Sequence, residues 1–372
     1  MNYKVRFVNY PLQYKNLKRE IDTAITRVLT KGDLILREDV ETFEKNLASF
    51  VGVKYAVGVN SCTDALIFSL MANGVGAGDE VITVSHTFFA TVEAITHCGA
   101  KPILVDVEKD FLIDATAIEG VITKKTKAIL PVHLNGRLSD MVKIMALAKK
   151  YKLAVIEDAA QALGAKIKME NGAWKMAGSF GSAGCFSFYP AKILGGAGDG
   201  GAVVTNNKTL ADVVRLLRNH GQKTKTEIVR YGFTSRLHNI QAAILNAKFA
   251  HVPEWIKKRQ QIARAYDKGL SSLSSIVLPP KPDARHIDVY QNYVLRVKKR
   301  DELFKYLAQQ GTETLIKDSI PLHHQKALGL SDFRLPFSEK LAKEVISLPM
   351  YPELTNKEID YVISCIKNFY QG

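Results

Sequence analysis

The chain has 372 residues, 47% of them hydrophobic, and it carries a formal net charge of +14 at pH 7. At about 100–200 residues per domain, this length predicts two domains, or one large domain with an appendage, and a core that needs no covalent cross-links. The basic residues are dispersed, and no helix-turn-helix, RNA-binding or zinc-finger signature organises them, which argues against a nucleic-acid partner and favours an anionic small substrate.

The cysteines and the lengths of the apolar runs indicate the cellular compartment of the protein. The four cysteines form no C-x-x-C pair and have no metal-ligand spacing with a histidine, so we expect thiols of a reducing compartment and no metal site. The first residues lack the apolar run of a signal peptide, and no stretch approaches the roughly 18 apolar residues that a membrane helix needs. We therefore predict a soluble, cytoplasmic protein without a membrane partner.

Short apolar runs alternate with helical patterns between residues 54 and 205. Several of these runs are almost entirely apolar, which is typical of strands that are covered on both faces. The alternation predicts an α/β fold with a mostly parallel sheet and helices on both sides. The seven predicted strands cover residues 54–60, 80–86, 101–107, 127–134, 153–158, 184–190 and 200–205, and helices between them include 63–74, 91–99 and 139–151.

The remainder of the chain predicts a smaller α+β domain. Residues 239–270 have the pattern of a long helix that Pro253 bends or divides, and a turn-rich segment follows at 278–286. The further predicted elements are a strand at 290–297 and helices at 300–311, 337–347 and 354–370. We place the domain division at residue 250, so that the large domain covers 1–250, with an N-terminal arm, and the small domain 251–372.

Candidate site residues follow the predicted strands, because ligands of a parallel α/β sheet bind at the carboxyl ends of the strands. Cys62 and Thr63 stand at a predicted helix start, which suits either a helix cap or a bound phosphate. Phe88 is either a core residue or a ring that stacks on a planar ligand. Asp158 ends a buried strand and needs a partner, which is a salt bridge, a helix cap or a cationic heterocycle.

Lys192 follows the sixth strand and precedes a glycine-rich segment, residues 195–201. That segment is not a Walker P-loop, because no G-K-[ST] ends it, and not a dinucleotide fingerprint, because a strand follows it. A lysine among small residues can have a lowered pKa and attack carbonyl groups as an amine. Pyridoxal phosphate needs a Schiff-base lysine, a carboxylate for its pyridinium nitrogen, a phosphate cup and an apolar face contact, and this one cofactor fits all these positions.

Several motifs follow one another in order along the chain: N-S-C-T-D-A-L (60–66), E-D-A-A-Q-A-L-G-A (157–165), S-F-Y-P-A-K (187–192), G-D-G-G (198–201) and S-R-L-H-N-I-Q-A-A (235–243). In this order they resemble the DegT/DnrJ/EryC1/StrS family of sugar aminotransferases. The resemblance runs from about residue 10 to 370, and it implies the pyridoxal-phosphate-dependent transferase fold of type I, with a seven-stranded large domain and a small carboxyl-terminal domain.

The resemblance also implies roles for single residues. Lys192 would hold the cofactor and transfer protons, Asp158 would bond to the pyridinium nitrogen, and Gln161 would lie near the phenolic oxygen. Phe88 would stack on the ring. The phosphate cup would consist of Cys62, Thr63 and Ser187. Family members are homodimers with shared active sites, so the segment 232–236, which contains Thr234, would reach into the neighbour's site.

The implied reaction moves an amino group from L-glutamate to a keto sugar on a nucleotide. The form G-D-G-G, with Asp199, favours a 3-keto sugar, because family members that act at carbon 4 more often have G-E-G-G. The chain departs from the family pattern at Cys62, Thr234 and Arg37, and over residues 317–323. Phosphate or carboxylate groups of the substrate are expected to meet basic side chains near the site, with solvated surface positions as the alternative: Arg37, Arg236, Lys317 and His323.

Several alternatives stay open at this stage. A 4-keto sugar or a keto-cyclitol could be the amino acceptor. A sugar dehydratase on the same cofactor is disfavoured by Lys192, because those relatives have histidine at this position. A non-catalytic regulator that binds the cofactor is the alternative from another functional class. The sugar, the nucleotide base and the stereochemistry of the product cannot be deduced from the sequence.

Overall fold

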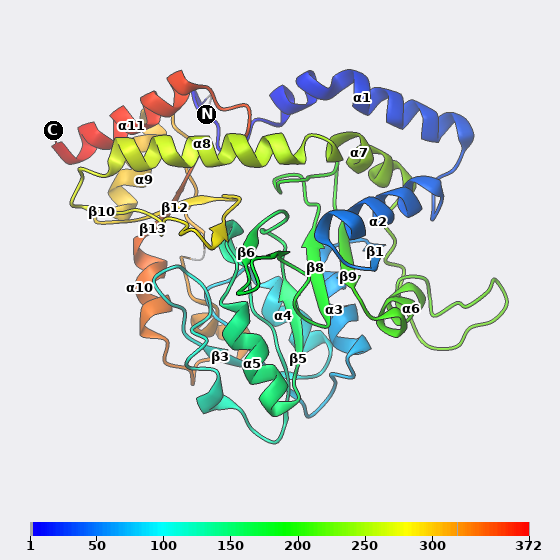
Figure 1. Cartoon of the computed structure of the whole chain (residues 1–372). Coiled ribbons are helices and arrows are strands. Elements are labelled where there is room, and N and C mark those ends of the chain that lie inside the picture. Colours follow the sequence, from blue (N-terminus) through cyan, green and yellow to red (C-terminus); the bar gives the residue numbers. More distant parts are fainter. Residues whose placement is uncertain (1–2, 318, 372) are drawn as a thin grey trace.

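A seven-stranded sheet forms the centre of the molecule in the computed structural model, which describes residues 3–317 and 319–371 (Figure 1). The strand order is β1-β9-β8-β5-β4-β2-β3, and β9 is antiparallel to both neighbours while the other neighbouring pairs are parallel. The strands are β1 (Tyr55–Val59), β2 (Glu80–Val84), β3 (Lys101–Val105), β4 (Thr126–Ile129), β5 (Ala154–Asp158), β8 (Ala183–Ser187) and β9 (Gly201–Thr205). Each strand overlaps one predicted run, so the α/β class and the seven-stranded sheet are confirmed.

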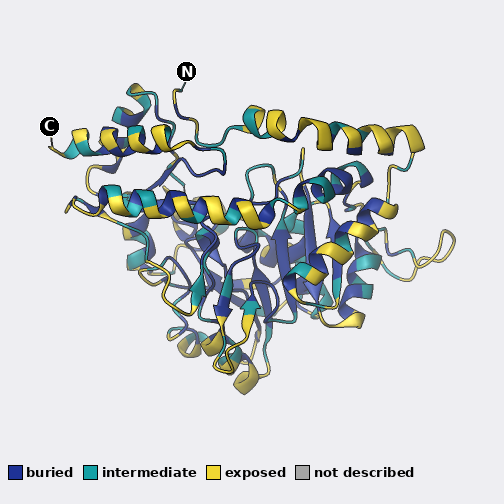
Figure 2. Cartoon of the chain, turned by 45° about the horizontal axis from the view of Figure 1, so that its top comes forward, coloured by how far each residue is buried: buried dark blue, intermediate teal, exposed yellow. Residues whose placement is uncertain are grey.

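Helices cover the sheet on both sides, and α5 lies in front of it in Figure 1 while α3 and α4 lie behind it. Their patterns explain the packing: in α6, Asn207 caps the first turn by accepting a hydrogen bond from the Leu210 amide, and the buried residues recur at helical spacing. Figure 2 shows the central strands as the buried layer beneath these helices. The bounds are α3 (Cys62–Ala72), α4 (Ala90–His97), α5 (Met141–Tyr151) and α6 (Lys208–Leu217).

Two N-terminal helices were not predicted from the sequence. Helix α1 (Tyr10–Lys31) ends at Gly32, which has a left-handed φ of 70°, and α2 (Glu38–Val51) follows. Helix α1 buries only a narrow stripe of small and aliphatic side chains and is otherwise exposed (Figure 2). It packs against α7 (Asn239–Phe249), which also contacts α2. The sequence analysis predicted only an N-terminal arm for these residues.

The carboxyl-terminal part has its own small sheet and its own hydrophobic cluster. The predicted long helix is divided as expected, because α8 begins at Val252 with Pro253 in its first turn. The predicted helix 337–347 is too long: α10 ends at Glu344, and Val345–Leu348 pairs with β12 as strand β13. The elements are α8 (Val252–Leu270), β10 (Ile276–Val277), β12 (Tyr293–Val297), α9 (Arg300–Gln309), α10 (Pro336–Glu344), β13 (Val345–Leu348) and α11 (Asn356–Gln371).

The N-terminal residues cross to this second part. Val5 belongs to the second hydrophobic cluster, and its amide donates to the Gly311 carbonyl at 3.0 Å. The division of the chain at residue 250 therefore stays a prediction.

A third sheet, unpredicted, joins β6 (Lys166–Lys168), β7 (Trp174–Met176) and β11 (His286–Ile287). Short 3-10 turns complete the described elements: Glu119–Val121, Leu134–Gly136, Leu322–His324 and Lys326–Leu328.

Within the described residues, no helix combines the length and the apolar character that crossing a bilayer requires.

Candidate functional site

A cavity of about 850 Å³ opens where the carboxyl ends of the parallel strands meet the C-terminal part and the N-terminal residues. This volume lies within the range of small-molecule sites. The cavity brings together eight of the predicted site residues: Cys62, Thr63, Phe88, Asp158, Gln161, Ser187, Lys192 and Lys317. Asp199 of the G-D-G-G motif also lines it.

Lys192 lies in the turn that follows β8. Its backbone amide donates to the Tyr189 carbonyl at 2.8 Å, and Gln291 holds the turn on both sides of it. The Gln291 side chain accepts from the Ile193 amide at 3.0 Å and donates to the Ala191 carbonyl at 2.8 Å. Burial lowers the pKa of Lys192, and the nearby Cys62 and Asp158 side chains oppose this shift. The lysine thus has a larger fraction of neutral amine at a given pH than a solvated lysine has.

Asp158 ends β5 and is 6% exposed. One carboxylate oxygen accepts from the Thr91 hydroxyl at 2.8 Å, and the other accepts from the Ala160 amide at 3.2 Å. Thr91 is itself buried and bonds to the Thr87 hydroxyl at 2.9 Å. The carboxylate is therefore fixed in direction where it faces the cavity, and a cationic ligand atom would complete its set of partners.

The neighbouring Glu157 has a structural environment, because alternate residues of a strand face opposite sides of the sheet. It is fully buried and accepts from the backbone amides of Gly178, Phe180 and Gly181. His133 adds a fourth contact at 2.9 Å. All contacts of Glu157 are thus with buried protein groups, and Asp158 is the acidic residue of this motif that faces the cavity.

The phosphate cup predicted after the first strand lies at the start of α3. Ser61 caps this helix by accepting from the Asp64 amide at 3.1 Å, and Cys62 and Thr63 occupy the first turn. The N-terminus of a helix favours an anion through its unpaired amides and its dipole. Strand β9 approaches so closely that a Cβ at Gly201 would lie 2.3 Å from the Ser61 carbonyl group, which explains the glycine there.

Cys62 occupies the position where the family pattern has glycine. Burial raises the pKa of its thiol, and the negative charge of Asp158 adds to this effect. The thiol is therefore protonated and uncharged at neutral pH, so the charge at this point of the cavity comes from Asp158 and Lys192. Its side chain occupies cavity space beside both groups, so this departure changes the shape of the site rather than its charge.

Phe88 follows β2 and lines the cavity with a side chain that is 68% exposed. An exposed aromatic ring at a cavity wall is available to stack on a planar ligand. The interpretation of Phe88 as a core residue, which the sequence left open, is thereby excluded. Its proposed contact with the cofactor ring stays a prediction.

A polar network at the cavity wall was only partly predicted. The Gln161 side-chain carbonyl accepts from the Asn135 amide at 2.8 Å and from the Asn292 side chain at 3.1 Å. Lys317 donates to the Asn292 carbonyl oxygen at 3.0 Å. Asn135 and Asn292 were missed. Asn135 follows a predicted strand, where an asparagine usually indicates a turn, and Asn292 falls inside the predicted strand 290–297.

Four predicted site residues do not line the cavity of their own chain. Thr234 bonds to His220 at 2.8 Å, Arg236 donates to Asn219 at 3.2 Å, and Arg37 contacts Asp33 at 3.4 Å. His323 is 1% exposed and bonds to Ser85, and Asp318 of the same segment lies outside the described residues. Their assignment to cofactor or substrate stays a prediction.

The chain matches the model of the DegT/DnrJ/EryC1/StrS aminotransferase family over residues 15–367. It is 43% identical to a pleiotropic regulatory protein of Geobacillus stearothermophilus, over 96% of each chain. It is 39% identical to a UDP-2-acetamido-2-deoxy-3-oxo-D-glucuronate aminotransferase of Pseudomonas aeruginosa, over 98% of this chain and 100% of the relative. The crystal structure of S. venezuelae DesV with a ketimine intermediate superposes with a TM-score of 0.95 at 38% identity, over 99% of each chain.

Proposed function

This chain belongs to the DegT/DnrJ/EryC1/StrS aminotransferase family, and we propose that it transfers an amino group from L-glutamate to a nucleotide-linked sugar with a keto group at carbon 3. It is a pyridoxal-phosphate-dependent aminotransferase, and solved relatives hold the cofactor or its amine form. The observation that carries the proposal is the meeting of Lys192 and Asp158 in one cavity.

The residues of the cavity fit this cofactor. When bound, the cofactor supplies an electron-withdrawing ring that stabilises negative charge at the carbon next to the amino group. Lys192 is the amine placed to hold the cofactor and then to accept and return a proton, as general base and acid. Asp158 is the carboxylate that would keep the ring nitrogen protonated. Phe88 would cover the ring, and the start of α3, with Ser187, would hold the phosphate.

Two observations support a sugar substrate with its keto group at carbon 3. Asp199 lines the cavity, so the residue that distinguishes G-D-G-G from G-E-G-G faces the ligand space. The P. aeruginosa relative acts, according to its name, on a UDP-linked 3-oxo sugar. That sugar is a glucuronate, and Lys317 in the same cavity would suit a carboxylate or a phosphate of the substrate. A 4-keto sugar and a keto-cyclitol are the alternative acceptors.

The proposed reaction can be followed by absorbance, because the lysine-bound cofactor absorbs in the visible and its amine form in the near ultraviolet. We expect excess L-glutamate to replace the visible band of the holoenzyme by the near-ultraviolet band. A UDP- or dTDP-linked 3-keto sugar should then restore the visible band faster than the matching 4-keto sugar or a keto-inositol. Faster recovery with a 4-keto sugar or keto-inositol would replace the carbon-3 assignment, and a visible band insensitive to every amino donor would favour a regulator.

We propose that two copies of the chain share their active sites. The segment after α6 extends away from the body (Figure 1) and carries exposed apolar side chains in the single chain: Ile228 67%, Val229 48%, Tyr231 99% and Phe233 46%. Exposed apolar residues in one segment mark a protein interaction surface. Thr234 and Arg236 follow directly, so a second copy seated on this segment would bring both residues near its own phosphate cup.

We expect sedimentation analysis to give twice the 41.3 kDa of one chain. Tyr231→Ala should weaken the dimer by at least about 30-fold, since buried interface tyrosines often contribute 2 kcal/mol or more. Tyr151→Ala removes a partly exposed tyrosine at the end of α5 and serves as the matched control. A wild-type monomer at micromolar concentration, or equal dimer affinities of the two variants, would contradict this assignment.

A cytoplasmic location is also part of our proposal, supported by four unpaired cysteines.

A further inference from the structure

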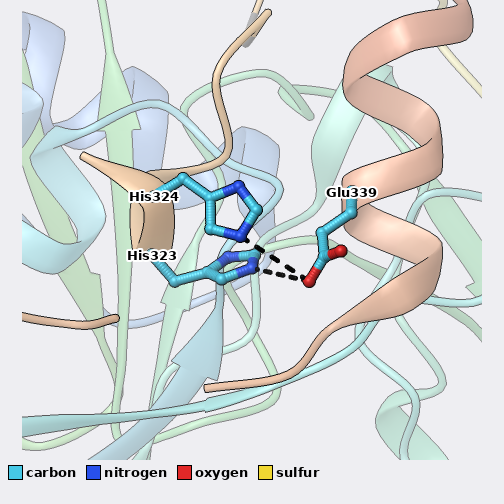
Figure 3. Close-up of side chains that lie close together, drawn as sticks. All are labelled: His323, His324 and Glu339. Atoms are coloured by element: carbon cyan, nitrogen blue, oxygen red, sulfur yellow. Dashed lines mark hydrogen bonds and ion pairs between the residues drawn. The ribbon is translucent and has the colours of Figure 1, made fainter. Parts of the chain in front are cut away.

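Three potential metal ligands lie close together outside the cofactor cavity. His323 and His324 belong to the 3-10 turn Leu322–His324, and Glu339 lies in α10. One ligand atom from each residue lies within 4.8 Å of the other two, and among residues 3–317 and 319–371 this is the one such group of three. Figure 3 shows both imidazole rings directed at the Glu339 carboxylate. The sequence analysis predicted no metal site, because no cysteine has metal-ligand spacing with a histidine.

The separations of the atoms suit a metal ion between them. The Nε2 atoms of His323 and His324 lie 3.3 Å and 3.7 Å from the same Glu339 oxygen, Oε1. Ligand atoms bound to Zn²⁺ at 2.0–2.2 Å with tetrahedral angles are separated by roughly 3.3–3.6 Å. A direct hydrogen bond between a charged imidazole and a carboxylate is typically shorter, at about 2.7–2.9 Å. The His323 contact is a long hydrogen bond, and both distances to Oε1 are close to the edges of a coordination tetrahedron.

The second ring nitrogen of His323 has the partner that a metal-bound histidine needs. Its Nδ1 lies 2.7 Å from the Ser85 hydroxyl, and the His323 backbone amide also approaches that oxygen at 3.4 Å. When Nδ1 carries the proton and donates to Ser85, the lone pair of Nε2 points at Glu339, and two acceptors face each other unless a cation lies between them.

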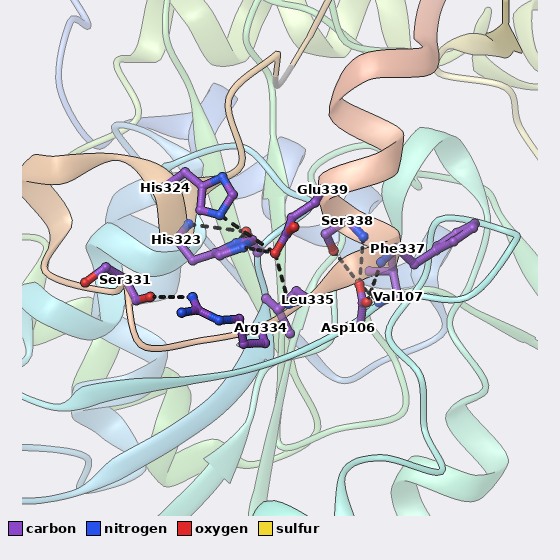
Figure 4. Close-up of polar contacts among 11 residues, drawn as sticks. Asp106, Val107, His323, His324, Ser331, Arg334, Leu335, Phe337, Ser338 and Glu339 are labelled. Atoms are coloured by element: carbon purple, nitrogen blue, oxygen red, sulfur yellow. Dashed lines mark hydrogen bonds and ion pairs between the residues drawn. The ribbon is translucent and has the colours of Figure 1, made fainter.

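Both segments that carry the ligands are fixed to the sheet (Figure 4). Asp106, directly after β3, accepts from the amides of Phe337 and Ser338 at 2.8 Å and 2.9 Å, and from the Ser338 hydroxyl at 2.6 Å. It therefore holds the first turn of α10, one residue before Glu339. The 3-10 turn is held by Ser85, directly after β2, and by a small apolar cluster: Val92, Leu104, Leu322, Leu330 and Leu335. The ligand atoms are thus preorganised by neighbouring strands.

We propose that His323, His324 and Glu339 bind a divalent transition-metal ion of the Zn²⁺ type, with solvent completing its coordination. Two imidazoles and one carboxylate are ligands that suit zinc and its neighbours rather than Mg²⁺ or Ca²⁺. The His324 and Glu339 side chains are 44% and 33% exposed, which leaves a path for the ion, whereas that of His323 is fully buried.

The ion would fasten the segment 322–339 to the large sheet. It would lie outside the cofactor cavity, but Ser85 precedes His86, whose side chain lines that cavity. The proposed role is therefore to stabilise the wall formed after β2, with no part in the amino transfer itself. This proposal does not depend on the proposed substrate.

The test is metal binding by the untagged holoenzyme, because an affinity tag made of histidines would bind zinc itself. After treatment with a chelator and dialysis, we expect about one equivalent of Zn²⁺ per chain to bind, as measured by competition with a chromogenic chelator. His324→Ala and Glu339→Gln change the exposed ligands and spare the buried His323. Each should weaken binding by at least about 100-fold, since loss of even an outer-shell partner costs about 10–100-fold.

His97→Ala is the matched control. His97 forms another exposed pair, with its Nε2 3.6 Å from Glu93 Oε1, and no third ligand from the described part of the chain joins this pair. This variant should bind Zn²⁺ like the wild type, and Zn²⁺ should raise the melting temperature of both. Co²⁺ should give visible bands of a four-coordinate site in the wild type and none in His324→Ala. Less than about a tenth of an equivalent of bound Zn²⁺, or equal affinities for all variants, would overturn the proposal.

Discussion

Replacing Lys192 with alanine is expected to lower kcat for amino transfer by at least about 10⁴-fold, because holding the cofactor and transferring the proton both depend on this amine. Burial lowers the pKa of Lys192, so at neutral pH a larger fraction of this lysine is the neutral amine that can act as base and nucleophile. The change removes no hydrogen bond of the side chain to its neighbours that the structure shows, so we expect the fold to persist. The measurement is the rate of 2-oxoglutarate formation from L-glutamate.

Adding a small amine to the solution distinguishes the loss of a catalytic amine from a loss of the fold. Methylamine in Lys192→Ala should restore part of the rate, because it can enter the emptied space and act as the base, whereas a misfolded variant gains nothing from it. Lys127→Ala is the matched control, since Lys127 is exposed in β4. Wild-type activity in Lys192→Ala would refute the assignment of the catalytic lysine, and with it the fit of the cofactor.

Asp158→Asn is expected to lower kcat by about 10²–10⁴-fold with little change in fold, because the amide has nearly the shape of the carboxylate but no charge. A neutral side chain no longer favours a proton on the ring nitrogen of the bound cofactor, and the ring then withdraws electrons less strongly. The variant should still bind the cofactor through Lys192 and the start of α3. Cofactor content and the rate of the glutamate half-reaction separate these two effects.

Thr91→Val provides a graded comparison. The Thr91 hydroxyl donates to Asp158 at 2.8 Å. Removing this hydroxyl keeps the negative charge of Asp158, but the carboxylate is then no longer held in one orientation. We expect a fall of about 10–100-fold, which is typical of lost outer-shell support at a functional site. Equal losses in Thr91→Val and Asp158→Asn would show that orientation, and not charge, is the contribution of Asp158.

The apolar runs of the sequence were sufficient to predict the seven strands of the sheet, with Asp158 at the end of one strand and Lys192 shortly after another. Because the carboxyl ends of parallel strands lie at one edge, the sequence alone predicts both residues in one site. The structure brings both into the same cavity. These predictions succeeded because periodicity and strand order are local properties of the chain.

Helix α1 and strand β13 show where local patterns were insufficient. The buried stripe of α1 is narrow, and the helix is stabilised by packing on α7, more than two hundred positions further along the chain. Val345 and Ile346 continue a helical pattern, yet pairing with β12 makes them a strand, since β-branched residues accept either state and tertiary contacts decide.

The sequence by itself thus determined the fold class, the family and the principal candidates for the chemistry. Only the tertiary structure decided which polar residues meet. It joins Gln161 to Asn292 and Lys317 at one cavity wall, and it places Ser85 against His323, 238 positions away. The physical reason is that hydrogen bonds between distant residues depend on the packing of whole elements, and this packing leaves no periodic signal in the residues that form them.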